Sequence, residues 1–166
     1  MNNFLSCKQL NKRIKTLTLF FMAALLISGI TAFDPAFFLK PLLTFFPSTH
    51  DASGTGYWLH YVYAGLETSS AQYPFLLYGY DWLAFAHIMI AILFIGVYKE
   101  PVRNKWVIDF AIISCIAILP FAFVCGHIRQ IPIGWRLIDC SFGIFGLLPL
   151  ALLRNSISQL EHKNKK

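Results

Sequence analysis

Four long stretches of the chain are almost free of charged side chains, and charged residues stand at both ends of each. They cover residues 16–33, 82–98, 106–128 and 137–153. At a rise of about 1.5 Å per residue, helices of these lengths cover roughly 26–34 Å, which matches a hydrocarbon layer of about 30 Å. The pattern predicts an all-α, polytopic membrane protein, with a bundle of four transmembrane helices in a single membrane domain over residues 1–166.

The overall composition agrees with a lipid environment. Hydrophobic residues make up 57% of the chain and charged residues only 13%, whereas soluble domains carry about 25% charged residues. The net charge is +6, but the basic residues form short clusters beside the apolar stretches, where lysine and arginine meet lipid headgroups. We therefore expect the lipid bilayer as a partner and no nucleic acid.

The basic residues are distributed unevenly between the two sides of the predicted bundle. Of the 14 lysines and arginines, only Lys40, Arg129 and Arg136 fall in the segments that follow the first and third spans. All others precede the first span, separate the second from the third, or follow the fourth. Because basic flanks resist translocation, both termini are predicted to be cytoplasmic.

A cleavable signal peptide is the alternative interpretation of the first span. A basic start, an apolar stretch and the sequence from Ile30 to Ala32 loosely imitate a processing site. The apolar stretch is longer than a usual signal core, and isoleucine fits poorly where a small residue is needed. We therefore favour a retained transmembrane helix.

The segment 34–81, between the first two spans, is rich in aromatic residues. Aromatic rings favour the headgroup region, so the segment is predicted to lie on the membrane as an extracytoplasmic lid. We expect an interfacial helix over 35–46 that is broken near Pro41, a flexible turn over 48–55 and a short helix over 57–67. The aromatic residues are Phe37, Phe38, Phe45, Phe46, Tyr57, Trp58, Tyr61, Tyr63, Tyr73, Phe75, Tyr78 and Tyr80.

Polar residues that are unusual in membrane spans concentrate toward the outer ends of the second, third and fourth spans. An outward-facing polar pocket beneath the lid is the functional hypothesis that they support. The lid adds His60 and Glu67, which are seven residues apart and share a helical face. The candidate ligand-binding residues are His60, His87, His127, Arg136 and Asp139, and the candidate catalytic residues are His87, Asp139 and Glu67.

Each candidate also has a structural interpretation. Arg136 and Asp139 are three residues apart and can pair along one helix. Asp109 follows Lys105 by four residues, which favours an ion pair at the inner boundary or a carboxylate that reaches the water. For His87, the alternative is a neutral imidazole hydrogen-bonded to a neighbouring helix.

The histidines and cysteines show no recognisable cofactor motif. No histidine has the tight spacing of a zinc site, so no metal is predicted. Haem ligation by His87 and His127 stays open because both are predicted near the same membrane face, and no cofactor is assigned. Cys125 and Cys140 lie on either side of a predicted hairpin, where a disulfide is an alternative to ordinary buried thiols.

Small residues and prolines in the spans predict how the helices pack. Gly143 and Gly146 share a stripe of the fourth span with Asp139 and Leu150, and small side chains there let a neighbouring helix approach closely. Pro120 and Pro149 lie deep in the third and fourth spans, and each is expected to bend its helix.

Two stretches resemble small bacterial membrane proteins of unassigned activity. They are residues 73–87, YPFLLYGYDWLAFAH, and residues 126–143, GHIRQIPIGWRLIDCSFG. The resemblance covers roughly the second half of the chain and implies a bacterial cytoplasmic (inner) membrane. It supplies no activity, ligand or site residue. Sterol-isomerase-like proteins, quinone-linked thiol oxidases and cytochrome b bundles share only the number of helices with this chain.

Three functions are compatible with this pattern. The first is a non-enzymatic membrane protein that binds a small apolar or amphipathic ligand, or a partner helix, at its outer face beneath the lid. The second is a membrane enzyme acting on a lipid-like or quinone-like substrate, with His87 as acid or base and Asp139 or Glu67 orienting it. The third is an accessory subunit of a membrane complex, which the small size of the chain and the stripe at Gly143 and Gly146 favour; a homo-oligomer is a further possible partner.

Overall fold

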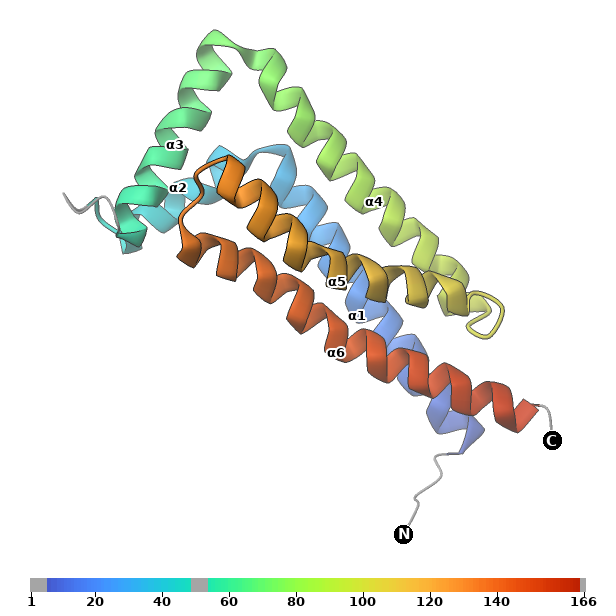
Figure 1. Cartoon of the computed structure of the whole chain (residues 1–166). Helices are drawn as coiled ribbons and strands as arrows, with labels where there is room; N and C mark the ends of the chain where they lie inside the picture. Colours follow the sequence, from blue (N-terminus) through green and yellow to red (C-terminus); the bar gives the residue numbers. More distant parts are fainter. Residues whose placement is uncertain (1–5, 49–53, 165–166) are drawn as a thin grey trace. The chain divides into compact units, whose positions relative to one another are not determined.

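In the computed structural model, which describes residues 6–48 and 54–164, the chain is helical and these residues form no strand. Four helices, α1, α4 with the preceding η1, α5 and α6, are long and apolar enough to cross a membrane. The prediction of an all-α chain with four helices of membrane-spanning length is therefore confirmed. The elements are α1 (Cys7–Phe33), α2 (Pro35–Phe45), α3 (Thr55–Gln72), η1 (Pro74–Leu77), α4 (Tyr78–Lys99), α5 (Lys105–Ile128) and α6 (Ile133–Asn164) (Figure 1).

Two of the long helices extend well beyond the apolar stretches. Helix α1 begins at Cys7 rather than at residue 16, and α6 continues to Asn164 rather than ending at residue 153. Lysine, arginine, glutamine and glutamate, which occur in these extensions, are good helix formers in water. Each extension also keeps apolar side chains on the core, since Leu10 and Leu160 are both buried. The ends are helical because they remain amphipathic.

The segment between α1 and α4 is more regular than predicted. Helix α2 begins with the Asp34 carboxylate accepting a hydrogen bond from the Phe37 amide at 3.0 Å, and it continues through Pro41. The break expected at Pro41 is therefore wrong, although proline removes one helical hydrogen bond there. Helix α3 runs to Gln72, past the predicted end at 67. Of the predicted turn over 48–55, residues 49–53 lie outside the described residues.

The chain packs as two compact units. Unit 1 consists of Met1–Ala23 and Ala91–Lys166, and unit 2 of Ala24–Ile90. Unit 1 therefore holds the first half of α1, the second half of α4, and α5 and α6. Unit 2 holds the second half of α1, then α2, α3 and η1, and the first half of α4.

The core of unit 1 is built from all of its helical segments. The rings of Phe21 and Phe94 lie 5.0 Å apart between α1 and α4, and the Lys15 ammonium lies 5.1 Å from the centre of the Tyr98 ring. Fully or almost fully buried side chains continue along each helix toward the chain termini, which indicates close packing at that end. They include Leu10, Ile14, Thr18, Ala91, Phe94, Val97, Val107, Ile108, Leu150, Leu153, Ser156, Ile157 and Leu160.

Helices α5 and α6 run side by side and approach closely at a glycine (Figure 1). A Cβ atom on Gly143 would lie 2.6 Å from the backbone oxygen of Cys115, and one on Gly146 would lie 3.0 Å from the Cys115 sulfur. Neither glycine can be enlarged without a shift of its neighbour. The predicted role of the small-residue stripe, close approach of a neighbouring helix, is confirmed, and the neighbour is α5.

Ion pairs also join α6 to the first turns of α5. The Arg154 side chain donates a hydrogen bond to the Asp109 carboxylate, and Lys105 lies 3.3 Å from a Glu161 carboxylate oxygen. Asp109 therefore forms an ion pair, as expected, but its partner is Arg154 rather than Lys105. Asp109 and Lys105 each pair with a residue of α6, because α6 continues far enough to present Arg154 and Glu161.

The turn from α5 to α6 is a Schellman motif. The Ile131 amide donates to the Gly126 carbonyl at 2.8 Å, and the Gln130 amide donates to the His127 carbonyl at 3.1 Å. This pattern places Gln130 at the position that usually requires glycine, and its φ is 56°. Pro132 follows at once and cannot continue α5, so the hairpin is fixed by local hydrogen bonds.

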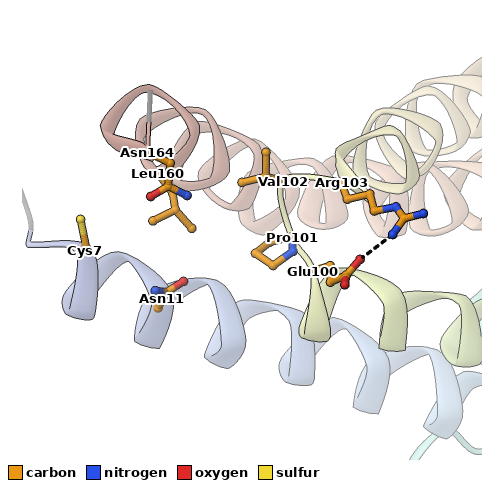
Figure 2. A pocket seen from close by; sticks show the side chains of 8 residues that line it. All are labelled: Cys7, Asn11, Glu100, Pro101, Val102, Arg103, Leu160 and Asn164. Carbon is orange, nitrogen blue, oxygen red and sulfur yellow. Dashed lines mark hydrogen bonds and ion pairs between the residues drawn. The ribbon is translucent and has the colours of Figure 1, made fainter. Parts of the chain in front are cut away.

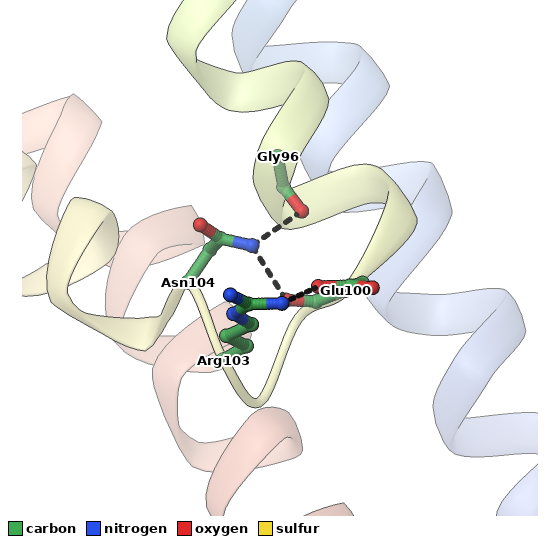
Figure 3. A network of polar contacts seen from close by, with 4 residues as sticks. All are labelled: Gly96, Glu100, Arg103 and Asn104. Atoms are coloured by element: carbon green, nitrogen blue, oxygen red, sulfur yellow. Dashed lines mark hydrogen bonds and ion pairs between the residues drawn. The ribbon is translucent and has the colours of Figure 1, made fainter.

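The turn from α4 to α5 is held by the side chain of Asn104 (Figure 3). Its amide nitrogen donates to the carbonyls of Gly96 and Glu100, each at 3.0 Å. A Cβ on Gly96 would lie only 3.2 Å from the Asn104 Cγ, so the glycine makes room for the amide. Asn104 thereby adds a side-chain donor to two carbonyls that already accept backbone N–H groups, from Glu100 and from Asn104 itself.

Replacing Asn104 by alanine is expected to destabilise unit 1 by about 1–3 kcal/mol, because the two hydrogen bonds of its side-chain amide are lost. The measurement is the midpoint of unfolding, followed by circular dichroism in detergent. Asn155→Ala is the matched control, since Asn155 is exposed on α6 and accepts only a 3.4 Å hydrogen bond from Gln159. Equal midpoints for the two variants would contradict the role assigned to Asn104.

Candidate functional site

The α5–α6 hairpin carries three of the predicted site residues, all in unit 1. Arg136 is half-buried, and its Nε donates to the Ile131 carbonyl at 2.7 Å. Its aliphatic stem crosses Gly126, where a Cβ atom would lie 2.9 Å from the Arg136 Cδ. Arg136 therefore fastens the start of α6 to the end of α5, which gives this residue a structural role.

The expected pair between Arg136 and Asp139 is wrong. Within residues 6–48 and 54–164, Arg136 forms no ion pair, and Asp139 has neither a hydrogen bond nor an ion pair. The guanidinium reaches back to the Ile131 carbonyl instead of forward along the helix. Asp139 is half-buried on α6 and His127 is exposed on α5, so their side chains are available to a ligand or partner.

His87 lies on α4 in unit 2, opposite a glycine of α1. Its Nδ1 is 2.8 Å from the carbonyl oxygen of Leu83, one turn earlier on the same helix. Because a carbonyl only accepts hydrogen bonds, Nδ1 carries a proton, and in the neutral imidazole Nε2 has the lone pair. A Cβ on Gly29 would lie 3.1 Å from the His87 Cβ, so the helix backbones approach closely there.

The hydrogen bond of His87 differs from the expected one in its partner. The structural interpretation placed the acceptor on a neighbouring helix, whereas the acceptor belongs to α4 itself. The bond to Leu83 fixes the tautomer but leaves one nitrogen free to accept a proton or a hydrogen bond. His87 therefore keeps the chemical capacity that made it a candidate.

Helix α3 brings His60, Tyr63 and Glu67 onto one helical face, as the spacing predicts. The Tyr63 hydroxyl donates to a Glu67 carboxylate oxygen at 2.6 Å. This hydrogen bond, with smaller contributions from burial and from the charges of Glu67 and Asp34, raises the pKa of the Tyr63 phenol. Tyr63 thus stays protonated and holds the Glu67 carboxylate in place.

Two ring nitrogens on α3 are buried without a partner. Within the described part of the chain, neither Trp58 Nε1 nor His60 Nε2 has a hydrogen bond. Buried polar atoms are normally paired, and an unpaired one indicates a water molecule or a ligand atom. Both atoms lie in unit 2, in the segment predicted as a lid.

The structure divides the predicted site residues between the two units. His60, Glu67 and His87 belong to unit 2, and His127, Arg136 and Asp139 belong to unit 1. Within unit 2, hydrogen bonds join Glu67 to Tyr63 and His87 to Leu83. The convergence of these six residues in one pocket stays a prediction.

An aromatic groove on the first turns of α4 was not predicted. Tyr78, Asp81, Trp82 and Phe85 line a cavity of about 240 Å³. The Trp82 ring meets Tyr78 at 5.9 Å and Phe85 at 5.8 Å, both edge to face, which is a favourable arrangement of aromatic rings. The spacing of the three rings places them on one helical face, and this periodicity was the signal that could have revealed the groove.

Further aromatic side chains are exposed on the elements that precede this groove. Phe37 and Phe45 on α2 are 67% and 78% exposed, and Phe75 on η1 is 71% exposed. Helix α2 has 11 residues, which is too short to cross a bilayer, and η1 forms the beginning of the apolar stretch that continues as α4. Large rings exposed on a short helix and at the beginning of a span indicate contact with headgroups, a ligand or another protein.

The metal-ligating side chains are dispersed in the described residues. Among them, no group of three or more histidine, cysteine, aspartate or glutamate side chains could hold a metal ion. Cys7, Cys115, Cys125 and Cys140 are all free thiols. The disulfide considered between Cys125 and Cys140 is therefore not formed, and the alternative of unpaired thiols holds.

The class defined by this fold is an all-helical protein with four helices of membrane-spanning length, which supports an integral membrane protein. No protein-family model matches the chain, and neither curated proteins nor solved structures show significant similarity to it. Its function is therefore inferred from its own side chains.

Proposed function

We propose that the chain is a non-enzymatic integral membrane protein that binds a small amphipathic, lipid-like ligand at its outer face. The binding surface consists of α2, α3, η1 and the first turns of α4. The observation that carries the proposal is the groove of Tyr78, Asp81, Trp82 and Phe85, which combines three aromatic rings with one carboxylate. This combination suits a ligand with an apolar body and a polar end.

The surroundings of the groove support an amphipathic rather than a purely apolar ligand. A volume of about 240 Å³ is below the 300–1,000 Å³ usual for a complete ligand pocket, so the groove would hold one part of the molecule. The carboxylate of Asp81 favours a hydroxyl or cationic group beside the rings. The unpaired nitrogens of Trp58 and His60 offer further hydrogen-bonding positions on α3.

In this proposal both termini are cytoplasmic and segment 34–81 lies on the extracytoplasmic side of a bacterial inner membrane. The uneven distribution of lysine and arginine supports this orientation. The aromatic residues of the segment suit the interface between lipid and water, where an apolar ring and a polar tip are both accommodated. A ligand drawn from the outer leaflet would reach the groove directly.

Replacing Trp82 by alanine is expected to lower ligand retention about tenfold, since truncating a central aromatic residue commonly removes this much affinity. The measurement is native mass spectrometry of the purified protein, which counts small molecules retained in detergent. Trp106→Ala is the matched control, because Trp106 on α5 is 57% exposed and Trp82 is 56% exposed. A bare polypeptide mass, or equal losses in the two variants, would refute ligand binding in the groove.

A membrane enzyme is the second candidate, and the tautomer of His87 favours it. With Nδ1 bound to Leu83, Nε2 is able to accept a proton from a substrate. Glu67, which belongs to the same unit, would orient this histidine or the substrate. His87→Ala separates the two functions, because a ligand-binding protein would keep its ligand and cellular phenotype while an enzyme would lose its activity.

A further inference from the structure

A cleft of about 580 Å³ opens at the end of unit 1 where α1 begins and α6 ends. Asn11 of α1 forms one wall, Leu160 and Asn164 of α6 form the other, and the turn 100–103 closes one end (Figure 2). Helix packing is tight immediately beside it, since Leu10 is fully buried and Ile14 is 1% exposed. The cleft is thus an opening within an otherwise closely packed part of the protein.

The contact between Lys15 and Tyr98 gives the level of the cleft relative to lipid. These residues stand at the boundary of the apolar stretches in α1 and α4, and the Lys15 ammonium lies 5.1 Å from the Tyr98 ring centre. Asn11 is one helical turn, about 6 Å, beyond Lys15, and Glu100 is about 3 Å beyond Tyr98. The headgroup layer adds roughly 5–7 Å to each side of the hydrocarbon. Lipid headgroups at this boundary would therefore reach the cleft.

The side chains that line the cleft can bind both a negatively charged and a positively charged group of a ligand. The carboxamides of Asn11 and Asn164 and the guanidinium of Arg103 are donors suited to phosphate oxygens. The Glu100 carboxylate accepts hydrogen bonds and favours an ammonium group. A cleft that contains one carboxylate and one guanidinium matches a zwitterion better than an anion alone.

The fold does not require the charges of Glu100 and Arg103 at this position. The Asn104 side chain already donates to the carbonyls of Gly96 and Glu100 at the end of α4 (Figure 3). Glu100 and Arg103 face each other at 3.4 Å, and their side chains are 60% and 83% exposed. Ion pairs this exposed contribute little to stability, so both groups are able to turn toward a ligand at small cost.

We propose that this cleft binds a zwitterionic phosphate–ammonium group, as in a phosphoethanolamine headgroup. Asn11, Asn164 and Arg103 hold the phosphate, and Glu100 holds the ammonium. Leu160 and Val102 supply apolar contact for the adjoining carbon atoms. Because the cleft is level with the membrane boundary, the phospholipid of the adjacent leaflet is the source that its position favours.

The test uses the full chain in nanodiscs that contain equal amounts of phosphatidylethanolamine and phosphatidylglycerol with the same acyl chains. After release into detergent, native mass spectrometry counts the lipids retained. The wild type is expected to retain phosphatidylethanolamine about two- to fivefold better, the range for one partly exposed ion pair. Glu100→Gln is expected to remove this preference, and Arg103→Gln to lower retention of both lipids.

Arg129→Gln is the control, because Arg129 is exposed at the end of α5 and does not line the cleft; it is expected to keep the wild-type preference. Matching circular dichroism spectra show that the variants are folded, which is expected because both cleft side chains are exposed. A second arm titrates water-soluble glycerophosphoethanolamine, and Glu100-dependent binding there supports the same site with a soluble ligand. No preference in the wild type, a preference for phosphatidylglycerol, or an unchanged preference in Glu100→Gln would overturn the proposal.

Discussion

Replacing Gly143 by valine is expected to destabilise the packing of α5 on α6 by at least about 2 kcal/mol. A Cβ at this position would lie 2.6 Å from the Cys115 backbone oxygen, a separation that requires one helix to move. Overpacking usually costs 1–3 kcal/mol, and a backbone atom cannot move aside as a side chain does. The measurement is the unfolding midpoint of the purified protein in mixed micelles, followed by circular dichroism.

Two companion variants separate helix contact from the general effect of replacing glycine. Gly134 lies on the same helix and a Cβ there has nothing within 4 Å, so Gly134→Val should change stability by less than about 0.5 kcal/mol. Gly146→Ala meets the Cys115 sulfur at 3.0 Å, and a second change, Cys115→Ala, should relieve it. The same second change should not rescue Gly143→Val, because the obstructing atom is backbone. Equal midpoints for the valine variants at 134 and 143 would rule out this packing.

The elements that depend on local pattern were predictable. Uncharged stretches with charged ends gave the four apolar helices, because length and hydropathy are properties of adjacent residues. The stripe containing Gly143 and Gly146 follows from helical periodicity, and its contact with α5 was foreseen as a close approach. The prediction that residues 57–67 are helical was also correct. The ends of α1 and α6 were missed because composition marks where lipid ends, not where a helix ends.

The long-range contacts of the charged residues were not predictable from spacing. Asp109 pairs with Arg154 and Lys105 with Glu161, although Lys105 and Asp109 are correctly spaced to pair with each other. Which partner is chosen depends on how far α6 continues and on which face it turns toward α5. The same limit explains Arg136, whose preferred acceptor is a carbonyl freed by the hairpin rather than the nearest carboxylate.

The candidate site was predicted in its residue types more than in its arrangement. His87 and Glu67 have the polar contacts expected of positioned groups, but their partners are the Leu83 carbonyl and the Tyr63 hydroxyl. The aromatic groove at Tyr78, Trp82 and Phe85 was overlooked because aromatic residues at a membrane boundary have an ordinary explanation as anchors. Only the cavity they line together distinguishes a binding surface from an anchor.

The two units differ in how completely they bury their side chains, and this difference bears on function. Unit 1 buries large apolar residues on every helix, including Phe94, Ile108 and Ile157. In unit 2, α2 and η1 bury no residue, and α3 buries only Gly56, Leu59 and Leu66 among those described. Elements with few buried contacts are the ones that rearrange most readily around a ligand. The proposed outer binding surface therefore lies in the unit best able to adapt to one.

The native cysteine at residue 7 provides the sharpest test of orientation. Cys7 is exposed at the start of α1, so a cytoplasmic amino terminus predicts that a membrane-impermeant maleimide labels it only after cells are permeabilised. A cysteine placed at Ser70, which is exposed on α3, should be labelled in intact cells when Cys7 is replaced by serine. Cys125→Ser is added both to the chain with native Cys7 and to the chain with a cysteine at residue 70, so that the half-buried thiol cannot react. Cys115 and Cys140 are buried.

This labelling pattern also distinguishes a retained first helix from a cleaved signal peptide. Lysine and arginine beside α1 resist translocation, so the intact chain should keep Cys7 and react with the maleimide after permeabilisation. Cleavage near Ala32 would remove Cys7, leaving a shorter chain that is labelled at position 70 but never at position 7. Labelling of Cys7 in intact cells would reverse the proposed orientation. It would also place the aromatic groove on the cytoplasmic side and the cleft at Asn11 and Asn164 on the outer side.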